Sequence, residues 1–400
     1  MKYFKHLFDS AALALEDIFF KDRLADKVIE FAFKDHKKWG KRDRHFFAEN
    51  VYGCVRWWNQ LIYLTNAQDL KPSGQCHRAL GAHLLLNQHP LPEWYANMID
   101  EEAFRQTKDA LTQPHLIHAI PEWLEALGTQ ELGELWAPTM QELNKTAKVI
   151  LRCNTEKISR EDLQITLNTE GIQTRRLDES LFPEALELVE RANVFRTKAF
   201  EQGFFEVQDA SSQRVAEMLN PQPGERIIDA CAGAGGKSLH IASRMKNKGK
   251  IISMDIFERK LLELKKRARR SGTSLIEPRW IENTKTIKRL EKSADALLLD
   301  VPCSGLGVLK RNPDSKWKMS SEKIQNLRQT QQDILQNYTR MVKPGGRCVY
   351  ATCSVLPSEN QQQIEIFLKN SPGWKQVREE IILPQTHGYD GFYIALLQNR

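Results

Sequence analysis

Two cysteines stand in the same kind of position in this chain, a few residues at most after a β-type run and directly before a serine. Cys303 belongs to Asp300-Val-Pro-Cys-Ser, which follows the apolar residues 296–299, and Cys353 belongs to Ala351-Thr-Cys-Ser. A thiolate is a nucleophile that can form a covalent intermediate. The alternative is that each thiol is only a small buried apolar side chain, the common fate of cysteine. Two cysteines in equivalent positions favour the first interpretation, so both are candidate catalytic residues.

A glycine-rich segment, DACAGAGGKS at 229–238, is the second candidate for chemistry. A nucleotide-binding P-loop needs glycine where Cys231 stands, although Gly236-Lys237-Ser238 fits the end of that pattern. The dinucleotide fingerprint G-x-G-x-x-G fits Gly233 and Gly235, but the chain has Ser238 where the last glycine belongs. A tight turn without any ligand is a further alternative.

The same segment also suits S-adenosylmethionine (SAM). That ligand needs a glycine-rich turn near its methionine end and an acid at the end of the next strand to bind the ribose hydroxyls. Asp255 supplies such an acid about 20 residues further on. Because NAD would use the same acid, the loop and Asp255 leave both ligands open.

A thiol beside the loop favours SAM. C5 of cytosine is a poor nucleophile, but a thiolate that adds to C6 makes C5 enamine-like, so that C5 can attack a methyl group. Loss of the C5 proton and elimination of the thiolate then restore the ring. Methylation of nitrogen needs no thiol and typically places a polar-Pro-Pro-aromatic tetrad where this chain has Asp300-Val-Pro-Cys303. The target base must leave its stack to reach a thiol, so a single-stranded or flipped cytosine is expected.

Strands and helices alternate around these residues. Short apolar strands are predicted at 226–229, 250–255, 296–300, 347–351 and 392–397, with a turn at 341–346. This alternation predicts an α/β fold with a doubly wound, mostly parallel sheet. Ligands bind such sheets beyond the carboxyl ends of the strands, which is where the acids and both cysteines fall.

The rest of the chain differs in pattern. Residues 1–140 have helical periodicity throughout, and a basic stretch with an aromatic residue at 37–44 suits RNA or an ordinary interhelical loop. Residues 148–205 form a small mixed module in which Ser159 is predicted to cap a helix, with Asp162 three residues later.

Charge is concentrated in one segment. The chain carries a net charge of +7, yet residues 237–279 alone contain 13 Lys and Arg against 4 Asp and Glu. A basic tract of this kind suits RNA phosphates. The alternative is the solvated face of a helix whose core face is Leu261, Leu262 and Leu264.

Composition sets the class of protein. Hydrophobic residues make up 41% and charged residues 27% of the 400 residues, which is ordinary for a globular protein. No apolar run approaches the ~20 residues that cross a bilayer, and the first residues lack a signal-peptide pattern. Seven cysteines without a CxxC motif argue against disulfides and structural zinc. We therefore expect a cytoplasmic protein with no metal and no membrane, and a monomer because no coiled-coil pattern occurs.

The chain resembles the Nop/Sun family of RNA cytosine-C5 methyltransferases, and most of all their bacterial 16S rRNA methyltransferase B type. The resemblance covers nearly the whole chain and is carried by VQDASSQ (207–213), DACAGAGGK (229–237), DVPCSGLG (300–307), RNPDSKW (311–317), VKPGGRCVYATCSVLPSEN (342–360) and DGFY (390–393). It implies an all-α NusB-like RNA-binding domain at 1–140, a small α+β RRM-like module at 141–205 and a Rossmann-like SAM-dependent methyltransferase domain at 206–400.

The resemblance also implies roles for residues. Cys353 is the nucleophile at C6, Cys303 assists release of the methylated product, and Asp300 hydrogen-bonds the cytosine near SAM. Lys237 contacts the substrate or the active-site carboxylate. The implied cofactor-binding residues are Cys231, Ala232, Gly233, Ala234, Gly235, Gly236, Lys237, Asp255, Asp300 and, for the adenine, Glu282 or Asn283, which stand where the family has an aspartate.

The implied substrate is RNA, with rRNA as the first expectation. Two alternatives stay open at this point. One is a tRNA methyltransferase of the same family, and the other is an RNA-binding ribosome-assembly factor whose catalytic domain is inert.

Overall fold

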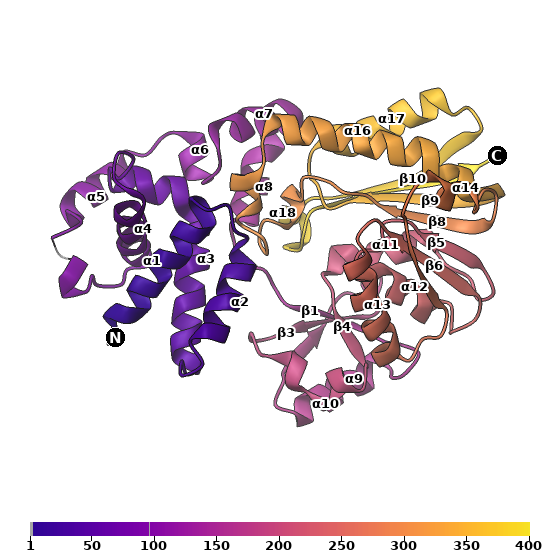
Figure 1. Cartoon of the computed structure of the whole chain (residues 1–400), viewed down its shortest axis with the longest axis horizontal. Coiled ribbons are helices and arrows are strands. Elements are labelled where there is room, and N and C mark those ends of the chain that lie inside the picture. The colour runs from indigo at the N-terminus through magenta and orange to yellow at the C-terminus, as the bar shows by residue number, and fades with distance from the viewer. Residues whose placement is uncertain (1–2, 96) are drawn as a thin grey trace. The chain divides into compact units, whose positions relative to one another are not determined.

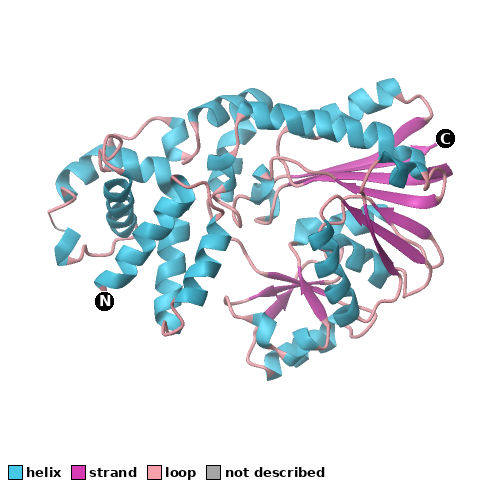
Figure 2. Ribbon diagram, viewed as in Figure 1, coloured by secondary structure: helices cyan, strands magenta, loops and turns pink. Residues whose placement is uncertain are grey.

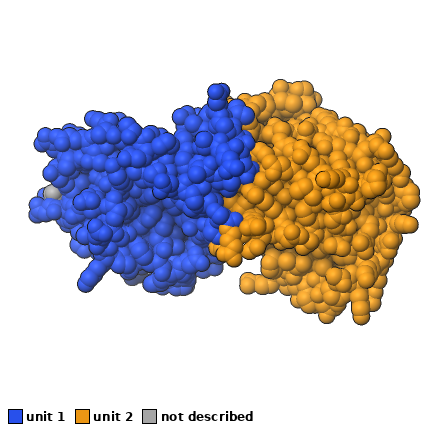
Figure 3. Space-filling model, turned by 90° about the horizontal axis from the view of Figure 1, so that it is seen from above, with its two compact units in different colours: residues 1–145, 309–321 blue, residues 146–308, 322–400 orange. Residues whose placement is uncertain are grey.

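The computed structural model describes residues 3–95 and 97–400. The chain forms two compact units, residues 1–145 with 309–321, and residues 146–308 with 322–400 (Figure 3). No helix within the described ranges is long and apolar enough to cross a membrane.

Unit 1 is helical, as predicted (Figure 1). Its core contains Leu15, Phe47, Leu80 and Tyr95, all fully buried. Its elements are α1 (Lys5–Phe19), α2 (Ala25–Asp35), α3 (Lys41–Leu64), α4 (Pro72–Leu86), η1 (Glu93–Tyr95), α5 (Glu101–Asp109), α6 (Pro114–Ile117), α7 (Glu122–Leu132), η2 (Gly133–Leu135), α8 (Trp136–Leu143) and α15 (Ser315–Lys318).

The segment 309–321, here called the strap, follows the Cys303 loop in sequence but folds with unit 1. Helix α3 is kinked at Trp57, whose backbone is non-helical, and a kink interrupts the hydrogen bonds of the preceding carbonyls. The strap binds two of those carbonyls. Lys316 Nζ donates to Arg56 O at 2.8 Å, and Trp317 Nε1 donates to Val55 O at 2.7 Å. Lys316 is fully buried, so the strap is an integral part of this core.

Unit 2 begins with a small antiparallel sheet of strand order β2-β3-β1-β4. Helix α9 packs its Leu163 and Leu167 on this sheet. The helix is capped as predicted, because the Ser159 side chain accepts a hydrogen bond from Asp162 N at 3.0 Å. The elements are β1 (Ile150–Cys153), α9 (Arg160–Thr169), β2 (Thr174–Arg176), β3 (Ala185–Leu188), η3 (Val194–Arg196), α10 (Lys198–Glu201) and β4 (Phe205–Val207).

The large sheet of unit 2 has seven strands in the order β10-β11-β9-β8-β5-β6-β7. Strands β9, β8, β5, β6 and β7 are parallel, and β11 and β10 add antiparallel pairs at one edge. Helices lie on both of its faces (Figure 2), which confirms the doubly wound fold. The strands are β5 (Arg226–Asp229), β6 (Lys250–Asp255), β7 (Ile276–Trp280), β8 (Ala294–Asp300), β9 (Val342–Thr352), β10 (Trp374–Ile382) and β11 (Phe392–Asn399).

The remaining elements connect these strands. They are α11 (Ala210–Leu219), α12 (Gly236–Arg244), α13 (Glu258–Ser271), α14 (Thr284–Lys288), η4 (Leu306–Val308), α16 (Ser321–Tyr338), η5 (Thr339–Met341), η6 (Pro357–Glu359), α17 (Gln361–Asn370) and α18 (Pro384–His387).

Two details of the large sheet differ from the prediction. The turn expected at 341–346 lies mostly inside β9, which pairs Val342 with Ala294 and then resumes at Arg347 opposite Ala296, so the glycines form an irregularity in the strand. The two edge strands, β7 and β10, were not predicted, because their side chains are mostly half-buried or exposed and their alternation of apolar residues is weak.

Candidate active site

The predicted site residues gather at one edge of the large sheet. Asp229, Asp255 and Asp300 end the parallel strands β5, β6 and β8, and Cys353 follows β9 directly. Because these four strands are neighbours and parallel, their carboxyl ends meet. The parallel order therefore brings the glycine loop, the acids and both cysteines to the same edge, as the sequence predicts.

Backbone geometry explains two of the three glycines in the loop at 231–237, because Gly233 and Gly235 both have positive φ. Gly235 has φ +84°, and a Cβ there would lie 2.6 Å from Leu264 Cγ, so no larger residue fits. Asp255 holds the loop from the next strand, since its Oδ2 accepts from Gly233 N at 2.8 Å and its Oδ1 accepts from Phe257 N at 2.8 Å. One carboxylate thus fixes the position of both the glycine loop and the first residues after β6.

A cavity of about 750 Å³ opens beside this loop. Predicted residues that line it are Cys231, Ala232, Gly233, Ala234, Asp255, Glu282, Asn283 and Asp300, whereas Gly235, Gly236, Lys237, Cys303 and Cys353 do not. An acid at a strand end, a turn with free backbone approach, and apolar walls from Ile256 and Ile281 are the features that an adenosyl ligand such as SAM requires. The residues present therefore fit that cofactor.

Helix α16 supplies cavity residues that the sequence reasoning missed. Thr330, Asp333, Ile334 and Tyr338 line the side of the cavity formed by this helix. They recur at three- and four-residue spacing along one helical face, and this spacing is a signal that the sequence offered.

Asn283 also has a structural role, because its side chain caps α14 by accepting a hydrogen bond from Lys285 N at 3.0 Å.

The two cysteines are in contact. Their Sγ atoms are 3.4 Å apart, and both side chains are only partly buried. The contact with Cys353, together with burial, raises the pKa of Cys303 well above its ordinary value. Cys303 is therefore held as a neutral thiol beside the other sulfur.

Lys237 and Asp300 form the charged part of the site. Lys237 Nζ lies 2.7 Å from Asp300 Oδ2 and 5.3 Å from the centre of the Phe392 ring. Burial alone would lower the pKa of Lys237, but the attraction of Asp300 outweighs burial and raises it. An ammonium group is thus kept charged in a largely desolvated position.

Glu359 is a further site residue that the sequence reasoning missed. Its carboxylate is fully buried and accepts four hydrogen bonds: from Ser304 N at 2.8 Å, from the hydroxyls of Ser304 and Ser354 at 2.5 Å each, and from Gln331 Nε2 at 3.1 Å. Ser304 follows Cys303 and Ser354 follows Cys353. One carboxylate therefore ties together the two loops that carry the thiols.

The basic segment 237–279 is not one continuous surface. Several of its cations pair with acids: Arg267 and Arg270 with Glu206, Arg244 with Glu184, and Lys250 with Glu277. On α13 the side chains of Lys265 and Arg269 are exposed instead, and the exposed Lys266 lies 3.5 Å from Glu263. The predicted core face of α13 is wrong at Leu262, which is 51% exposed, while Leu261 and Leu264 are buried.

Comparison with known proteins adds to this geometry. The family model described as 16S rRNA methyltransferase RsmB/F matches residues 216–398, and the RsmF/B-like ferredoxin-like domain model matches residues 120–195. The probable ribosomal RNA small subunit methyltransferase B of Synechocystis sp. is 32% identical over 440 residues, covering 97% of this chain and 98% of that protein.

Two further similarities concern a second relative and a solved structure. The ribosomal RNA small subunit methyltransferase B of Proteus mirabilis is 35% identical over 288 residues, which cover 70% of this chain and 66% of that one. The crystal structure of PH0851 has a TM-score of 0.82 at 25% identity and covers 98% of this chain and 99% of that chain.

Proposed function

Since this chain belongs to the 16S rRNA methyltransferase RsmB/F family, we propose that it methylates C5 of a cytosine in small-subunit rRNA through a covalent bond between Cys353 and C6. The observation that carries the proposal is the pair of thiols 3.4 Å apart at the ends of neighbouring strands, beside a Lys237–Asp300 ion pair. Methylation of a heteroatom would need neither thiol.

The cavity beside the glycine loop would hold SAM, which supplies an electrophilic methyl group. Asp255 would bind the ribose hydroxyls, the backbone at 231–234 would approach the methionine part, and Ile256 and Ile281 would enclose the adenine. Glu282 or Asn283 would contact the adenine edge. Lys237 would orient the Asp300 carboxylate toward the reacting groups through their ion pair.

The two cysteines would divide the work. The Cys353 thiolate adds to C6 and forms a carbon–sulfur bond, so that the electron pair reaches C5, which then takes the methyl group. Asp300 accepts a hydrogen bond from the ring and orients it. Once the Cys353 sulfur is bonded to C6, it no longer raises the pKa of Cys303, whose thiolate then accepts the C5 proton. The electrons of that C–H bond expel the Cys353 thiolate and restore the ring. Both thiols have to stay reduced, which fits a cytoplasmic setting.

Mapping of 5-methylcytosine by bisulfite sequencing tests the reaction and the substrate together. A strain that lacks the gene should lose one 16S rRNA site, and the wild-type gene should restore it. Loss at a tRNA site instead would assign the tRNA alternative. No lost site in any RNA, with no label transferred from tritiated SAM, would leave the inert assembly factor.

Two alanine variants test the division of labour. Cys303→Ala should accumulate a covalent protein–RNA complex that survives a denaturing gel, because release is blocked. Cys353→Ala should give neither complex nor product. Cys348→Ala is the matched control, since Cys348 is buried in β9 five residues away and should leave turnover in place. A complex that forms with Cys353→Ala and not with Cys303→Ala would exchange the two roles.

A further inference from the structure

We infer that the small four-stranded module (residues 150–207) is a working part of the cofactor site, because its Arg152 and Glu206, acting with Arg267 of α13, fix the backbone of the glycine loop. The inference rests on the proposed binding of SAM at that loop. The module would then position the loop that holds the cofactor. Arg267, although it lies in the basic segment 237–279, would serve this purpose and not RNA binding.

Two arginines donate hydrogen bonds to backbone carbonyls of the glycine loop. Arg152 Nη1 donates to Gly236 O at 2.7 Å, and Arg267 Nη1 donates to Ala234 O at 2.9 Å. Arg152 is 2% exposed. The two carbonyls flank Gly235, whose left-handed backbone turns the loop into α12. Charged donors on both sides of this residue fix the direction in which the preceding peptide groups face the cavity.

Glu206 makes this pair of arginines possible. It lies directly opposite Arg152 in the β1–β4 pair, is 5% exposed, and accepts from Arg267 Nη2 at 3.0 Å and also from Arg270. Burial lowers the pKa of Arg152 to about 10, and the negative charge of Glu206 opposes that shift. Without this carboxylate, the buried Arg152 and the half-buried Arg267 would lose the negative charge that offsets their mutual repulsion.

The module also holds the far end of α13. Asn154 Nδ2 donates to Ser271 O at 3.0 Å, and Lys157 Nζ donates to Arg270 O at 2.8 Å. Gly203, at φ +70°, lies so close that a Cβ would be 2.0 Å from Arg270 O. These contacts satisfy the carbonyls that a helix leaves free at its end. Because α13 begins three residues after Asp255, its position helps to set the ribose side of the cavity.

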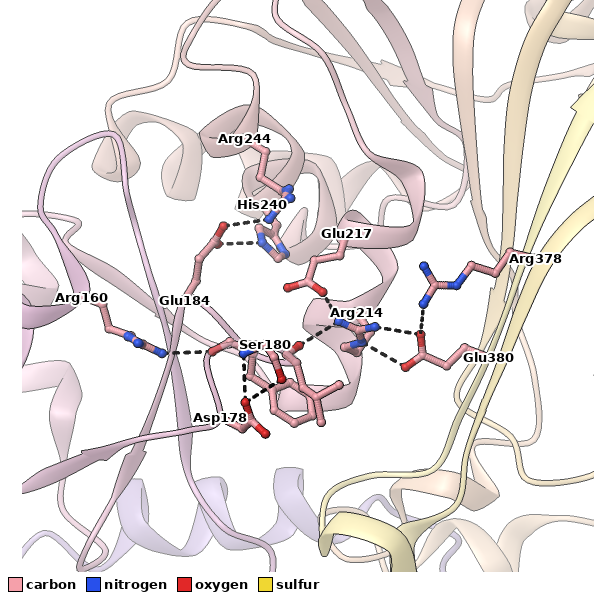
Figure 4. Close-up of polar contacts among 12 residues, drawn as sticks. Arg160, Asp178, Ser180, Glu184, Arg214, Glu217, His240, Arg244, Arg378 and Glu380 are labelled. Carbon is pink, nitrogen blue, oxygen red and sulfur yellow. Dashed lines mark hydrogen bonds and ion pairs between the residues drawn. The ribbon is translucent and has the colours of Figure 1, made fainter.

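A third contact reaches α12, the helix that starts at the loop. Glu184 Oε2 lies 2.7 Å from His240 Nε2, and Arg244 Nη1 donates to Glu184 Oε1 at 3.2 Å (Figure 4). Burial would raise the pKa of Glu184, but His240 and the neighbouring arginines lower it to about 2, so it is ionised. The module also contacts α11, since Arg214 Nη1 donates to Leu181 O at 2.8 Å. The module therefore contacts both helices that flank the cofactor loop.

The paired arginines and the exposed cations of α13 should have separable functions. A guanidinium that is bound to a buried carboxylate and a backbone carbonyl cannot release counterions from RNA, whereas an exposed one can. Arg267 belongs to the first class and Arg269, two residues away on the same helix, to the second. The chain thus provides its own matched control.

Calorimetric titration of the full-length protein with SAM, in the absence of RNA, tests the inference. Arg267→Met and Glu206→Gln should each weaken SAM binding by about tenfold, the effect of one charge-assisted hydrogen bond that is lost at the loop. Arg269→Met should bind SAM as the wild type does. Filter binding of transcribed 16S rRNA should give the opposite pattern, with a loss of affinity only for Arg269→Met.

A second readout separates positioning from general damage. At saturating SAM, the rate of Arg267→Met should return to within about twofold of the wild type, because KM for SAM changes and kcat does not. Arg267→Lys, which keeps the charge but can reach only one of the two acceptors, replaces Arg267→Met if that variant does not fold, and should be intermediate. Unchanged SAM affinity in folded variants, or equal losses of SAM and RNA affinity, would overturn the inference. A wild-type protein that binds no SAM would overturn the proposed function instead.

Discussion

Replacing Glu359 by glutamine should separate the two cysteine loops from each other without removing any group that touches substrate. The carboxylate receives four hydrogen bonds, and two of their donors are the hydroxyls of Ser304 and Ser354, at 2.5 Å each. Glutamine keeps the shape and one acceptor oxygen. Its amide nitrogen cannot accept, so both hydroxyls would have to reverse their role.

The size of the effect follows from these contacts. A hydrogen bond to a charged group contributes about 1.5–3 kcal/mol and a neutral one about 0.5–1.5 kcal/mol, so the loss of charge over four bonds should cost roughly 4–6 kcal/mol of folding free energy. A displacement of ~1 Å between reacting groups can lower a rate about 100-fold. We therefore expect kcat to fall by roughly 10- to 100-fold while KM for SAM stays the same.

The assay has two parts. Single-turnover methyl transfer to 16S rRNA measures the rate, with Glu365→Gln on the exposed face of α17 as the control. Alkylation of Cys303 against pH, followed by mass spectrometry in a Cys353→Ala background, measures the thiol. The negative charge of Glu359 helps to raise the pKa of Cys303, so the glutamine variant should react at lower pH. A wild-type rate together with an unshifted alkylation profile would refute this account of Glu359.

Three further outcomes are expected. Asp255→Asn can accept from only one of Gly233 N and Phe257 N, so calorimetry should show SAM affinity reduced by about 10- to 100-fold with RNA affinity intact; equal SAM affinity would contradict the role. Burial raises the pKa of Asp229 from 3.8 to about 7, so the folded state binds the extra proton and stability should fall as pH rises from about 4 to about 7. Urea denaturation should show that slope and its loss in Asp229→Asn; a slope that persists in the variant assigns it to other groups. Replacing Lys265 and Arg269 together by methionine should lower the salt dependence of RNA binding by about two counterions, and an unchanged slope would exclude α13 from the RNA surface.

The sequence predicted the gathering of the site because parallel strands impose it. Asp255, Asp300 and the two cysteines each follow an apolar run, and the carboxyl ends of parallel neighbours meet whatever lies between them in the chain. The glycine loop could also be predicted from the sequence, because Gly235 is required locally: its backbone is left-handed and packs against Leu264.

The roles of residues whose partners are distant in the sequence could not be predicted in this way. Glu359 lies in a short turn with no periodicity, and its donors come from residues 304, 331 and 354. Five of the six residues from Lys265 to Arg270 are basic. The acid that pairs with Arg267 and Arg270 is Glu206, about sixty residues earlier in the chain, so the local sequence does not reveal this pairing. Part of this pairing was indicated by the sequence. Arg267 and Arg270 follow Leu264 at intervals of three residues, which places them beside the buried face of α13.

The strap has a consequence for how the protein is made. Its residues leave the ribosome about 165 residues after Lys145, a delay of roughly 8–30 s at 5–20 residues per second. Throughout that interval the carbonyls of Val55 and Arg56 at the kink have neither Lys316 nor Trp317 as donors, and the ring of Phe19 lacks its contact with Trp317. The helical unit, although translated first, therefore reaches its final packing only after the segment that carries Cys303 has been synthesised.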